Sequence, residues 1–261
     1  MKETLVIGTR PSKLARWQAD FIRTLLKEKY PELNIRLHII KTQGDRNKKI
    51  SSWEGSGLKG LFTKEISDAL LNGSIDAAVH SMKDLPSMCI QGLMIGAVPV
   101  REDVTDIMVS KENVRLDNLP ASSKVGTVSL RRKCQLHHMR NDLNILDIRG
   151  NVPTRIRKVL EGPFDAVVLA KAGLKRLGLE DFIAEEFMIE QMLPSAGQGA
   201  LAVEIRSDDA SVGPVISSIN DADIYDVVMA EKALLHSLGG DCRVPVGAYG
   251  VLEGDEIALQ G

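Results

Sequence analysis

The chain has 261 residues and a net charge of −2, with 44% hydrophobic and 26% charged residues, values typical of a globular protein. The near-neutral charge and an aromatic content of 4% argue against a nucleic-acid-binding protein. No apolar run is long enough to cross a membrane or to serve as a signal peptide. The odd set of three cysteines has no metal-binding spacing. We therefore expect a cytoplasmic protein that binds neither nucleic acid nor membrane and holds no metal.

The N-terminal part predicts a strand, a helix and a second strand. An apolar strand at residues 5–8 leads into a helix that begins near Lys13, where Ser12 is placed to cap the free backbone amides. Another strand is expected over residues 35–40. Apolar residues at helical spacing predict the buried face of the helix, namely Leu14, Trp17, Phe21, Ile22 and Leu25.

A long polar segment separates this unit from the next helix. Residues 42–60 are rich in glycine, and such a segment inside a compact fold is usually functional or disordered. A helix then follows Leu61 and ends at Asn72-Gly73, and a strand is expected over residues 75–79.

The second half of the chain repeats these landmarks in the same order, which predicts two similar α/β units. Chance similarity of strand-to-helix turns is the alternative. The matched segments are residues 72–79 with 161–168, Gly8-Thr9 with Gly126-Thr127, and Thr42-Gln43-Gly44 with Arg149-Gly150-Asn151.

Two passages between these units predict a hinge of the periplasmic-binding-protein kind. Residues 94–109 lead from the first unit to the second, and the apolar residues 201–205 are placed to return to the first sheet. We expect domain 1 at residues 1–99 and 200–217, domain 2 at 100–199 and a small α+β domain 3 at 218–261. The last of these combines a helix over 222–238 with strands over 244–251 and 257–259, which is too little to stand alone.

The turn from Gly126 to Arg132 is the clearest candidate binding motif. It joins a short strand to a helix, so free backbone amides and the helix dipole favour an anion there. Ser129 adds a hydroxyl, and Arg131 and Arg132 add guanidinium groups suited to carboxylate or phosphate. An ordinary helix cap with two solvated arginines is the alternative.

Further charged residues follow strand ends, where ligands bind in open α/β sheets. Together they indicate a ligand with several carboxylates or phosphates, although each residue alone is typical of a surface. Two facing sheets are expected to place one set around a cleft, namely Arg10, Ser12, Lys83, Asp84, Arg131, Arg132 and Arg149. Arg155 and Arg176 extend the cationic set, and the loop 194–199 is either a backbone anion contact or a connector.

Asp84 and Cys242 are the candidates for chemistry. Asp84 follows a strand end among cationic residues, and a carboxylate in a cationic cleft stays ionised and stabilises a developing cation. The alternative is an ordinary turn, in which a Lys-Asp pair before a proline is common. Cys242 follows the glycine pair Gly239-Gly240 by two residues and precedes Arg243. A thiol in a glycine loop beside an arginine can be exposed and acidic, although free cysteines are more often buried.

These motifs resemble the porphobilinogen deaminase (hydroxymethylbilane synthase) family along nearly the whole chain. The resemblance rests on six stretches in order, namely residues 9–15, 79–86, 126–132, 149–151, 172–176 and 239–242. It implies two periplasmic-binding-protein-like domains and a third small domain. It also implies a transferase that joins four porphobilinogen molecules head to tail with loss of ammonia, on a covalent dipyrromethane, and releases hydroxymethylbilane with water for haem biosynthesis.

The resemblance also implies roles for single residues in a monomeric enzyme. Asp84 is the implied catalytic carboxylate, Cys242 the attachment point of dipyrromethane, and residues 42–60 the lid. The implied cofactor contacts are Lys83, Thr127, Ser129, Arg131, Arg132, Arg155 and Arg176. The implied contacts to incoming porphobilinogen are Arg10, Ser12, Gln18, Phe62 and Arg149.

Three departures from the family pattern accompany this resemblance. Val128 replaces the usual serine, Asp241 replaces a small residue, and the third domain is expected to be shortened. Two alternatives stay open on the residues alone. One is a non-catalytic binder of a polycarboxylate metabolite, which needs the arginines but neither Asp84 nor Cys242. The other is a phosphate-handling enzyme, for which the sequence offers no metal-binding acidic pair.

Overall fold

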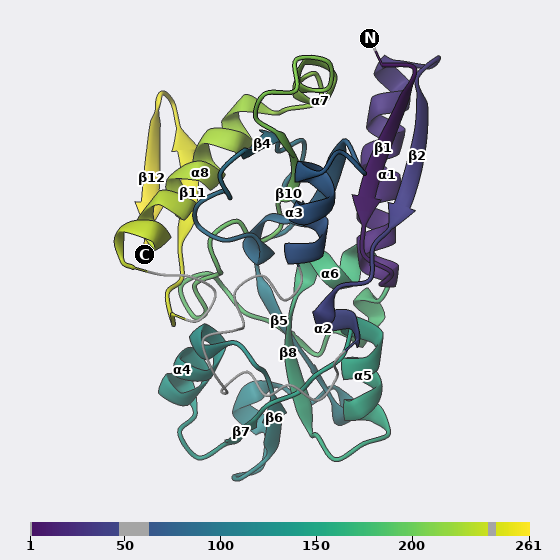
Figure 1. The fold of residues 1–261 in the computed structure, drawn as a ribbon. Coiled ribbons are helices and arrows are strands. Elements are labelled where there is room, and N and C mark those ends of the chain that lie inside the picture. Colours follow the sequence, from purple (N-terminus) through teal and green to yellow (C-terminus); the bar gives the residue numbers. More distant parts are fainter. Residues whose placement is uncertain (1, 47–62, 240–243) are drawn as a thin grey trace.

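The computed structural model describes residues 2–46, 63–239 and 244–261. Two five-stranded sheets form two lobes, one above the other in Figure 1, and a long helix with a two-stranded hairpin packs beside the upper lobe. The predicted fold class, two similar α/β units with a small third unit, is confirmed.

The first lobe is built on a sheet of strand order β2-β1-β3-β10-β4. β2 and β3 run parallel to β1, whereas β10 is antiparallel to β3 and β4, so the predicted return of the chain to this sheet is confirmed. The strands are β1 (Thr4–Thr9), β2 (Asn34–Ile39), β3 (Ala77–Ser81), β4 (Leu93–Ala97) and β10 (Leu201–Arg206). The helices are α1 (Lys13–Lys29), α2 (Gln43–Arg46), α3 (Lys64–Leu71), α7 (Gly213–Ser217) and the 3₁₀ turn η1 (Met82–Asp84).

The second lobe has a sheet of order β7-β6-β8-β5-β9, in which β7 and β8 run parallel to β6 and β5 is antiparallel to β8. The strands are β5 (Asp106–Ser110), β6 (Lys124–Gly126), β7 (Asn144–Leu146), β8 (Ala166–Ala170) and β9 (Glu185–Glu186). The helices are α4 (Leu130–Met139), α5 (Val152–Leu160), α6 (Lys171–Lys175) and the 3₁₀ turns η2 (Lys111–Asn113), η3 (Leu116–Asn118) and η4 (Glu180–Phe182).

The two sheets confirm the repeat read from the sequence. β6, β7 and β8 occupy the places that β1, β2 and β3 occupy in the first lobe, and each sheet adds an antiparallel strand from the segment that enters it through the hinge. The two passages between the lobes touch through an isolated β-bridge between Arg101 and Ala200. The carboxyl ends of the parallel strands in both lobes therefore carry the turns that hold the candidate residues.

The helix α1 packs on the first sheet through a face that overlaps the predicted one, with Ile22 buried and Phe21 and Leu25 against the core, but is shifted by one residue. Its buried residues are Ala15, Gln18, Ala19, Ile22 and Leu26. Trp17 is 38% exposed and stacks on Phe21, with ring centroids 5.4 Å apart. The expectation that Trp17 is buried was wrong, because the two alanines allow the helix to approach the sheet along a line shifted by one residue.

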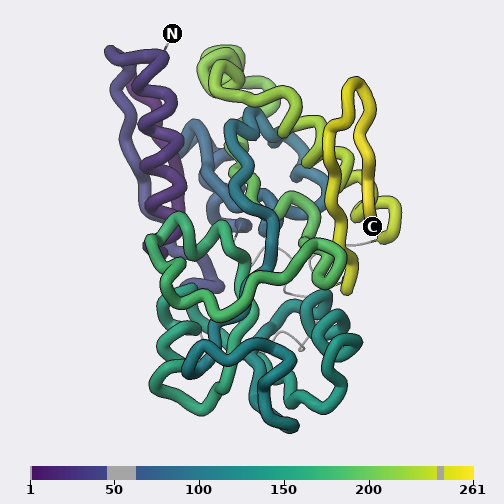
Figure 2. The backbone as a smooth tube through the Cα atoms, turned by 180° about the vertical axis from the view of Figure 1, so that it is seen from behind, coloured from purple at the N-terminus to yellow at the C-terminus, as the bar shows by residue number. Residues whose placement is uncertain are grey.

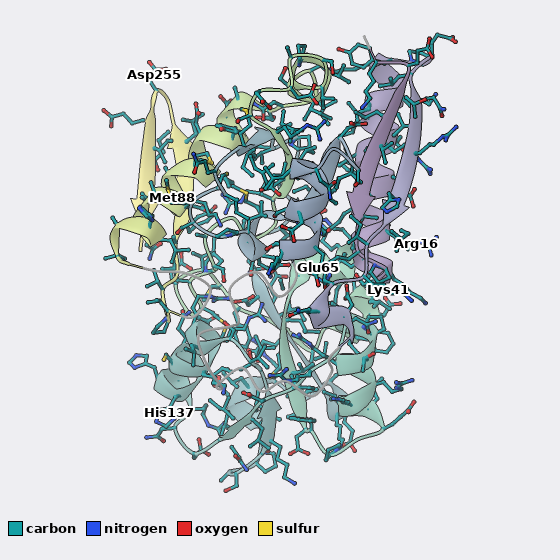
Figure 3. All side chains as sticks on the ribbon, viewed as in Figure 1. Arg16, Lys41, Glu65, Met88, His137 and Asp255 are labelled. Carbon is teal, nitrogen blue, oxygen red and sulfur yellow. The ribbon has the colours of Figure 1, made fainter. Side chains whose placement is uncertain are left out.

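The C-terminal unit consists of α8 (Ala222–Ser237) and the hairpin of β11 (Tyr249–Glu253) and β12 (Glu256–Gln260), which lie side by side in Figures 1 and 2. Asp255 lies at the hairpin tip (Figure 3). The strand predicted over residues 244–251 begins only at Tyr249. The earlier residues bond elsewhere, since the Ala248 amide donates to the Pro194 carbonyl at 2.9 Å.

Candidate active site between the lobes

The first lobe brings Arg10, Ser12 and Gln18 to the carboxyl end of β1. Ser12 caps α1 as predicted, accepting a hydrogen bond from the Ala15 amide at 3.2 Å. Arg10 Nη2 contacts Asp45 Oδ1 at 2.6 Å. Burial alone would raise the pKa of Asp45, but the hydrogen bond and charge of Arg10 hold it below its usual value. The buried Gln18 donates to Ser81 Oγ at 2.8 Å, which joins α1 to the end of β3.

The turn η1 presents Lys83 and Asp84 directly after β3. Asp84 is exposed, whereas Lys83 is half-buried and its Nζ donates to Gln198 Oε1 at 3.0 Å. Burial and repulsion from Arg132 lower the pKa of Lys83 to about 8, against the attraction of Asp84 and Asp106. Lys83 of the first lobe therefore lies within electrostatic range of charged groups of the second lobe, namely Arg131, Arg132 and Asp106.

In the second lobe, the turn between β6 and α4 is shaped by close contacts and caps. A side chain at Gly126 would collide with Ile148, because a Cβ there would lie 2.8 Å from Cγ2 of that residue. Thr127 Oγ1 accepts from the Ser129 amide at 3.2 Å, and Ser129 caps α4 by accepting from the Arg132 amide at 3.4 Å. The first turn of α4 thus carries Arg131 and Arg132 toward the interior.

A buried aspartate that the sequence analysis missed anchors both arginines. Asp106, the first residue of β5, has no exposed surface. Its Oδ2 contacts Arg131 Nη2 and its Oδ1 contacts Arg132 Nη2, each at 2.6 Å. Burial alone would raise the pKa of Asp106, but Arg132 and Arg131 hold it far below its usual value. An acidic residue at the start of an otherwise apolar strand was the available signal.

The two arginines differ in how many donors the protein itself uses. Arg131 also donates to Ser195 Oγ at 3.1 Å and to the Leu193 carbonyl at 2.6 Å. Arg132 donates through Nη1 to the Val168 carbonyl at 3.0 Å, and its buried Nε has no hydrogen-bond partner among the described residues. Each guanidinium nitrogen of Arg131 therefore donates a hydrogen bond to the protein, whereas Nε of Arg132 has no acceptor among the described residues.

Gln198 connects the hinge to this network. Its side chain is fully buried and donates to Asp106 Oδ1 at 2.8 Å and to the Val104 carbonyl at 2.6 Å, while accepting from Lys83. The sequence analysis considered loop 194–199 only as a backbone anion contact or a connector. The structure shows a connector whose side chain links both lobes.

Arg149 and Arg155 follow β7 and complete the second-lobe side. Arg155 Nε donates to the Gly150 carbonyl at 2.7 Å, and Asn151 caps α5. Burial and the charge of Arg132 lower the pKa of Arg155 to about 10, with Arg149 acting in the same direction and Asp84 opposing them. A carboxylate of the first lobe and guanidinium groups of the second thus lie within electrostatic range of each other.

Arg176, just after α6, lies between the lobes. It is 7% exposed, its Nη2 donates to the Gly199 carbonyl at 2.5 Å, and its guanidinium lies 5.8 Å from the ring centroid of Trp17. Burial lowers the pKa of Arg176 to about 10, with Glu102 acting in the opposite direction. Its contacts thus reach α1 and the return passage, which sequence spacing alone did not indicate.

Several predicted features lie outside the described residues, namely Phe62, Cys242, Asp241 and most of the segment 42–60. His137 and His138 are exposed on α4, and Figure 3 labels His137 there. Within residues 2–46, 63–239 and 244–261, no group of three or more His, Cys, Asp or Glu is arranged to hold a metal ion. In the same ranges no helix is long and apolar enough to cross a membrane.

Solved structures with low sequence identity to this chain share its fold. The methionine-binding protein MetQ aligns with a TM-score of 0.52 at 14% identity, covering 88% of this chain and 96% of MetQ. The periplasmic VFT2 domain of Bordetella pertussis BvgS aligns with a TM-score of 0.51 at 14% identity, covering 90% and 93%. The chain thus has a two-lobed fold similar to the folds of these two proteins, with a cationic centre between its lobes.

Sequence comparison identifies the family. Residues 5–213 match the model of the porphobilinogen deaminase, dipyromethane cofactor binding domain, and residues 225–261 match that of the porphobilinogen deaminase C-terminal domain. The porphobilinogen deaminase of Syntrophomonas wolfei is 47% identical over 257 residues, covering 98% of this chain and 84% of the relative. That of Desulfitobacterium hafniense is 48% identical over 255 residues, covering 98% and 82%.

The chain belongs to the porphobilinogen deaminase family. It is a transferase of tetrapyrrole biosynthesis, with porphobilinogen as substrate and dipyrromethane as cofactor. The family, the enzyme class and the cofactor that the sequence resemblance implied are confirmed.

Proposed function

We propose that Asp84 is the catalytic carboxylate of this transferase and that Lys83, Arg132 and Arg155 surround it with positive charge. The observation that carries this proposal is the position of Asp84 on η1, next to Lys83, whose Nζ donates to Gln198. Gln198 in turn donates to Asp106, which binds Arg132 of the second lobe. The exposed position of Asp84 on η1 leaves its carboxylate accessible to a ligand between the lobes.

The proposed chemistry follows from the charge that develops on the substrate. Loss of ammonia from the aminomethyl group of porphobilinogen leaves a cation delocalised onto the pyrrole nitrogen. A fixed carboxylate within hydrogen-bond distance of that N–H stabilises the cation and hence the transition state that leads to it. Asp84 is the residue that we assign to this task.

The cationic groups fit a cofactor that carries several carboxylate arms. The buried Nε of Arg132 lacks a partner within the described residues, and a carboxylate oxygen would satisfy it. When bound, the dipyrromethane supplies the pyrrole carbon to which the first porphobilinogen is joined. Arginine stays protonated throughout, so these side chains can bind the arms without joining the proton transfers.

We assign the remaining contacts as the resemblance implies. Ser12 and Ser129 already accept cap hydrogen bonds, and each hydroxyl keeps its proton for donation to a ligand oxygen. Cofactor contacts are proposed for Lys83, Thr127, Ser129, Arg131, Arg132, Arg155 and Arg176, with attachment at Cys242. Contacts to the incoming porphobilinogen are proposed for Arg10, Ser12, Gln18, Phe62 and Arg149.

We also propose, as the family resemblance implies, that a single chain is the working unit. Cys89 and Cys134 are free and exposed, which supports a reducing compartment and hence the cytoplasm. The boundaries proposed for the three domains remain 1–99 with 200–217, 100–199 and 218–261. The strand order, with β10 in the first sheet and α8 after it, supports this division.

The test of this function is the substitution Asp84→Asn, which keeps the shape of the side chain and removes its charge. We expect ammonia release per cofactor-loaded molecule to fall by at least about 10²-fold, while intact mass still shows the cofactor on folded protein. Asp255→Asn, at the exposed hairpin tip, is the matched control and should leave turnover unchanged. Near-normal turnover of Asp84→Asn would show that Asp84 is not the catalytic carboxylate.

A further inference from the structure

The helix α8 buries two adjacent charged residues that the active-site assignment does not use. Glu231 has no exposed surface and Lys232 is 3% exposed. Lysine and glutamate are almost never fully buried unless they are paired. Each of these side chains is therefore expected to have a specific structural partner.

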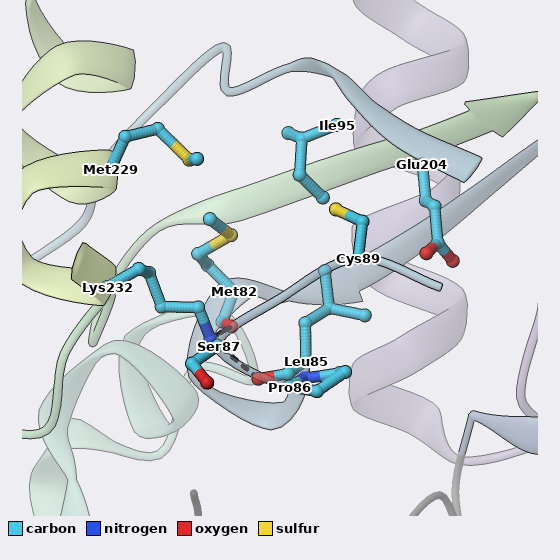
Figure 4. Close-up of a pocket in the computed structure, with 9 residues that line it drawn as sticks. All are labelled: Met82, Leu85, Pro86, Ser87, Cys89, Ile95, Glu204, Met229 and Lys232. Atoms are coloured by element: carbon cyan, nitrogen blue, oxygen red, sulfur yellow. Dashed lines mark hydrogen bonds between the residues drawn. The ribbon is translucent and has the colours of Figure 1, made fainter. Parts of the chain in front are cut away.

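Lys232 reaches the turn that carries Lys83 and Asp84. Its Nζ donates to the Leu85 carbonyl at 2.6 Å and to the Met82 carbonyl at 3.3 Å. Figure 4 shows both hydrogen bonds, with the lysine side chain approaching the turn from α8. The two carbonyls flank Lys83 and Asp84 in the sequence, so Lys232 holds the turn on both sides of the proposed catalytic residue.

The turn itself is short. η1 has three residues and no side-chain hydrogen bond at its N-cap Ser81, and its closing hydrogen bond runs from the Leu85 amide to the Met82 carbonyl at 3.2 Å. Besides Lys232, the Met82 amide, which donates to the Ala200 carbonyl, and Lys83, which donates to Gln198, hold it in place. Met82 and Leu85 are buried in a cluster with Val228 of α8. A small cavity lies next to this contact, lined by Met82, Leu85, Ile95, Met229 and Lys232 (Figure 4). The turn thus has room to shift if the lysine contact is lost.

Glu231 fixes the position of α8 independently of the turn. Its carboxylate contacts Arg101 Nη2 at 2.8 Å and accepts from the Gly197 and Gly250 amides, each at 2.7 Å. These partners belong to the two passages between the lobes and to β11. The helix is therefore anchored at the hinge, one residue before Lys232 reaches the catalytic turn.

We infer that Lys232 is a positioning residue. Its hydrogen bonds from α8 to the Met82 and Leu85 carbonyls hold η1 and so fix the Asp84 carboxylate relative to the second lobe. This inference rests on the proposed role of Asp84. It assigns the C-terminal unit a part in active-site geometry, separate from carrying the cofactor attachment residue. A small displacement of a catalytic group can cost up to about 10²-fold in rate, so the contact is expected to matter for turnover as well as for folding.

The test compares Lys232→Met with Lys232→Arg in the full chain. Methionine nearly preserves side-chain length and removes the donors, whereas arginine restores them. We expect Lys232→Met to lower kcat per loaded molecule by about 10- to 100-fold with little change in KM, and Lys232→Arg to recover most of the loss. Hydrogen exchange at the Leu85 amide should become at least about tenfold faster, while the Met82 amide, bonded to the Ala200 carbonyl at 3.0 Å, serves as the internal reference.

Arg206→Met is the matched control for a purely structural cation. Arg206 Nη1 donates to the Leu70 and Ile75 carbonyls at 2.8 and 2.7 Å, in the same lobe but away from η1. Its loss should lower stability and leave kcat per folded molecule unchanged. If Lys232→Met does not accumulate as folded protein, Lys232→Gln, which keeps an amide donor, is measured in the same way.

The outcomes separate this inference from the proposed function. If Lys232→Met changes neither kcat nor exchange at Leu85 while Asp84→Asn is inactive, the positioning role is wrong and the role of Asp84 stands. If Asp84→Asn keeps its activity, the role of Asp84 is wrong. Faster exchange at Leu85 in Lys232→Met would then still show that Lys232 holds the turn.

Discussion

The two lobes share a pair of hydrogen bonds before equivalent strands but carry different side chains at the carboxyl ends of their strands. In the first lobe, the Val6 amide donates to Asp76 Oδ2 at 2.9 Å and the Asp76 amide to the Val6 carbonyl at 2.8 Å. In the second, Lys124 and Asp165 repeat this exchange at 2.8 and 2.9 Å. The matched Asn72–Asp76 and Glu161–Asp165 segments thus lock equivalent strands together.

The difference between the lobes lies where ligands bind. The first lobe ends β3 in a short turn with an exposed carboxylate, Asp84, whereas the second begins α4 with two buried arginines braced by Asp106. A repeated scaffold therefore presents an exposed carboxylate in one lobe and a buried arginine pair in the other. The comparison teaches that the framework is shared and that chemistry depends on a few side chains at the strand ends.

The largest expected effect separates the two buried aspartates. Asp106→Asn should lower the free energy of unfolding by about 3–5 kcal/mol, because it leaves Arg131 and Arg132 buried without their counter-charge. Asp76→Asn should cost about 1–3 kcal/mol, since its partners Lys2 and Arg206 keep access to water. Urea denaturation of both variants measures the difference. Equal losses would contradict the view that the second lobe is organised around Asp106.

A pH titration sharpens the comparison at a smaller scale. Lys83 has a pKa of about 8 in the folded protein against an ordinary value of 10.5, whereas the arginines opposite stay charged. We expect the KM for porphobilinogen to rise above pH 8, by up to about tenfold per pH unit, because Lys83 loses the charge that attracts carboxylates. KM profiles between pH 7 and 9 test this, and Lys83→Met should have a flat profile. The same slope in both proteins would assign the titration to another group.

Deprotonation of Lys83 changes the free energy of unfolding and the ligand affinity in opposite directions. Between pH 8 and 10.5 the unfolded chain keeps a proton on Lys83 that the folded protein releases. The contribution of Lys83 to the free energy of unfolding therefore rises with pH over this range, while ligand affinity falls. Urea titrations at pH 8 and 10 on the wild type and Lys83→Met separate this contribution from that of other groups.

Local sequence rules predicted the framework because its signals are local. Ser12, Ser129 and Asn151 cap the helices that follow three strand ends, and the repeated landmarks correctly indicated two sheets of one kind. Hydrophobic spacing was less reliable for burial. Trp17 fits the apolar face of α1 by spacing but is partly exposed, since the neighbouring alanines set the contact line with the sheet.

The buried charges could not be predicted in the same way. Glu231 and Lys232 look like ordinary surface residues in a helix sequence, and the signal for Asp106 was only an acidic residue before an apolar run. The partners of all three lie far away in the chain. Arg131 stood out as an arginine in a binding motif, yet its described contacts are with the protein itself. The motifs predicted residues for this centre, and only the three-dimensional arrangement showed which of them brace the others.

The most direct test of the central claim is the electron density of the cofactor-loaded protein. We expect a thioether from Cys242 to a dipyrromethane between the lobes, with a pyrrole nitrogen about 3 Å from a carboxylate oxygen of Asp84 and carboxylate arms on Lys83, Arg132 and Arg155. Density that places the pyrroles away from Asp84, or a Cys242 sulfur on the far side of the molecule without a cofactor, would contradict it.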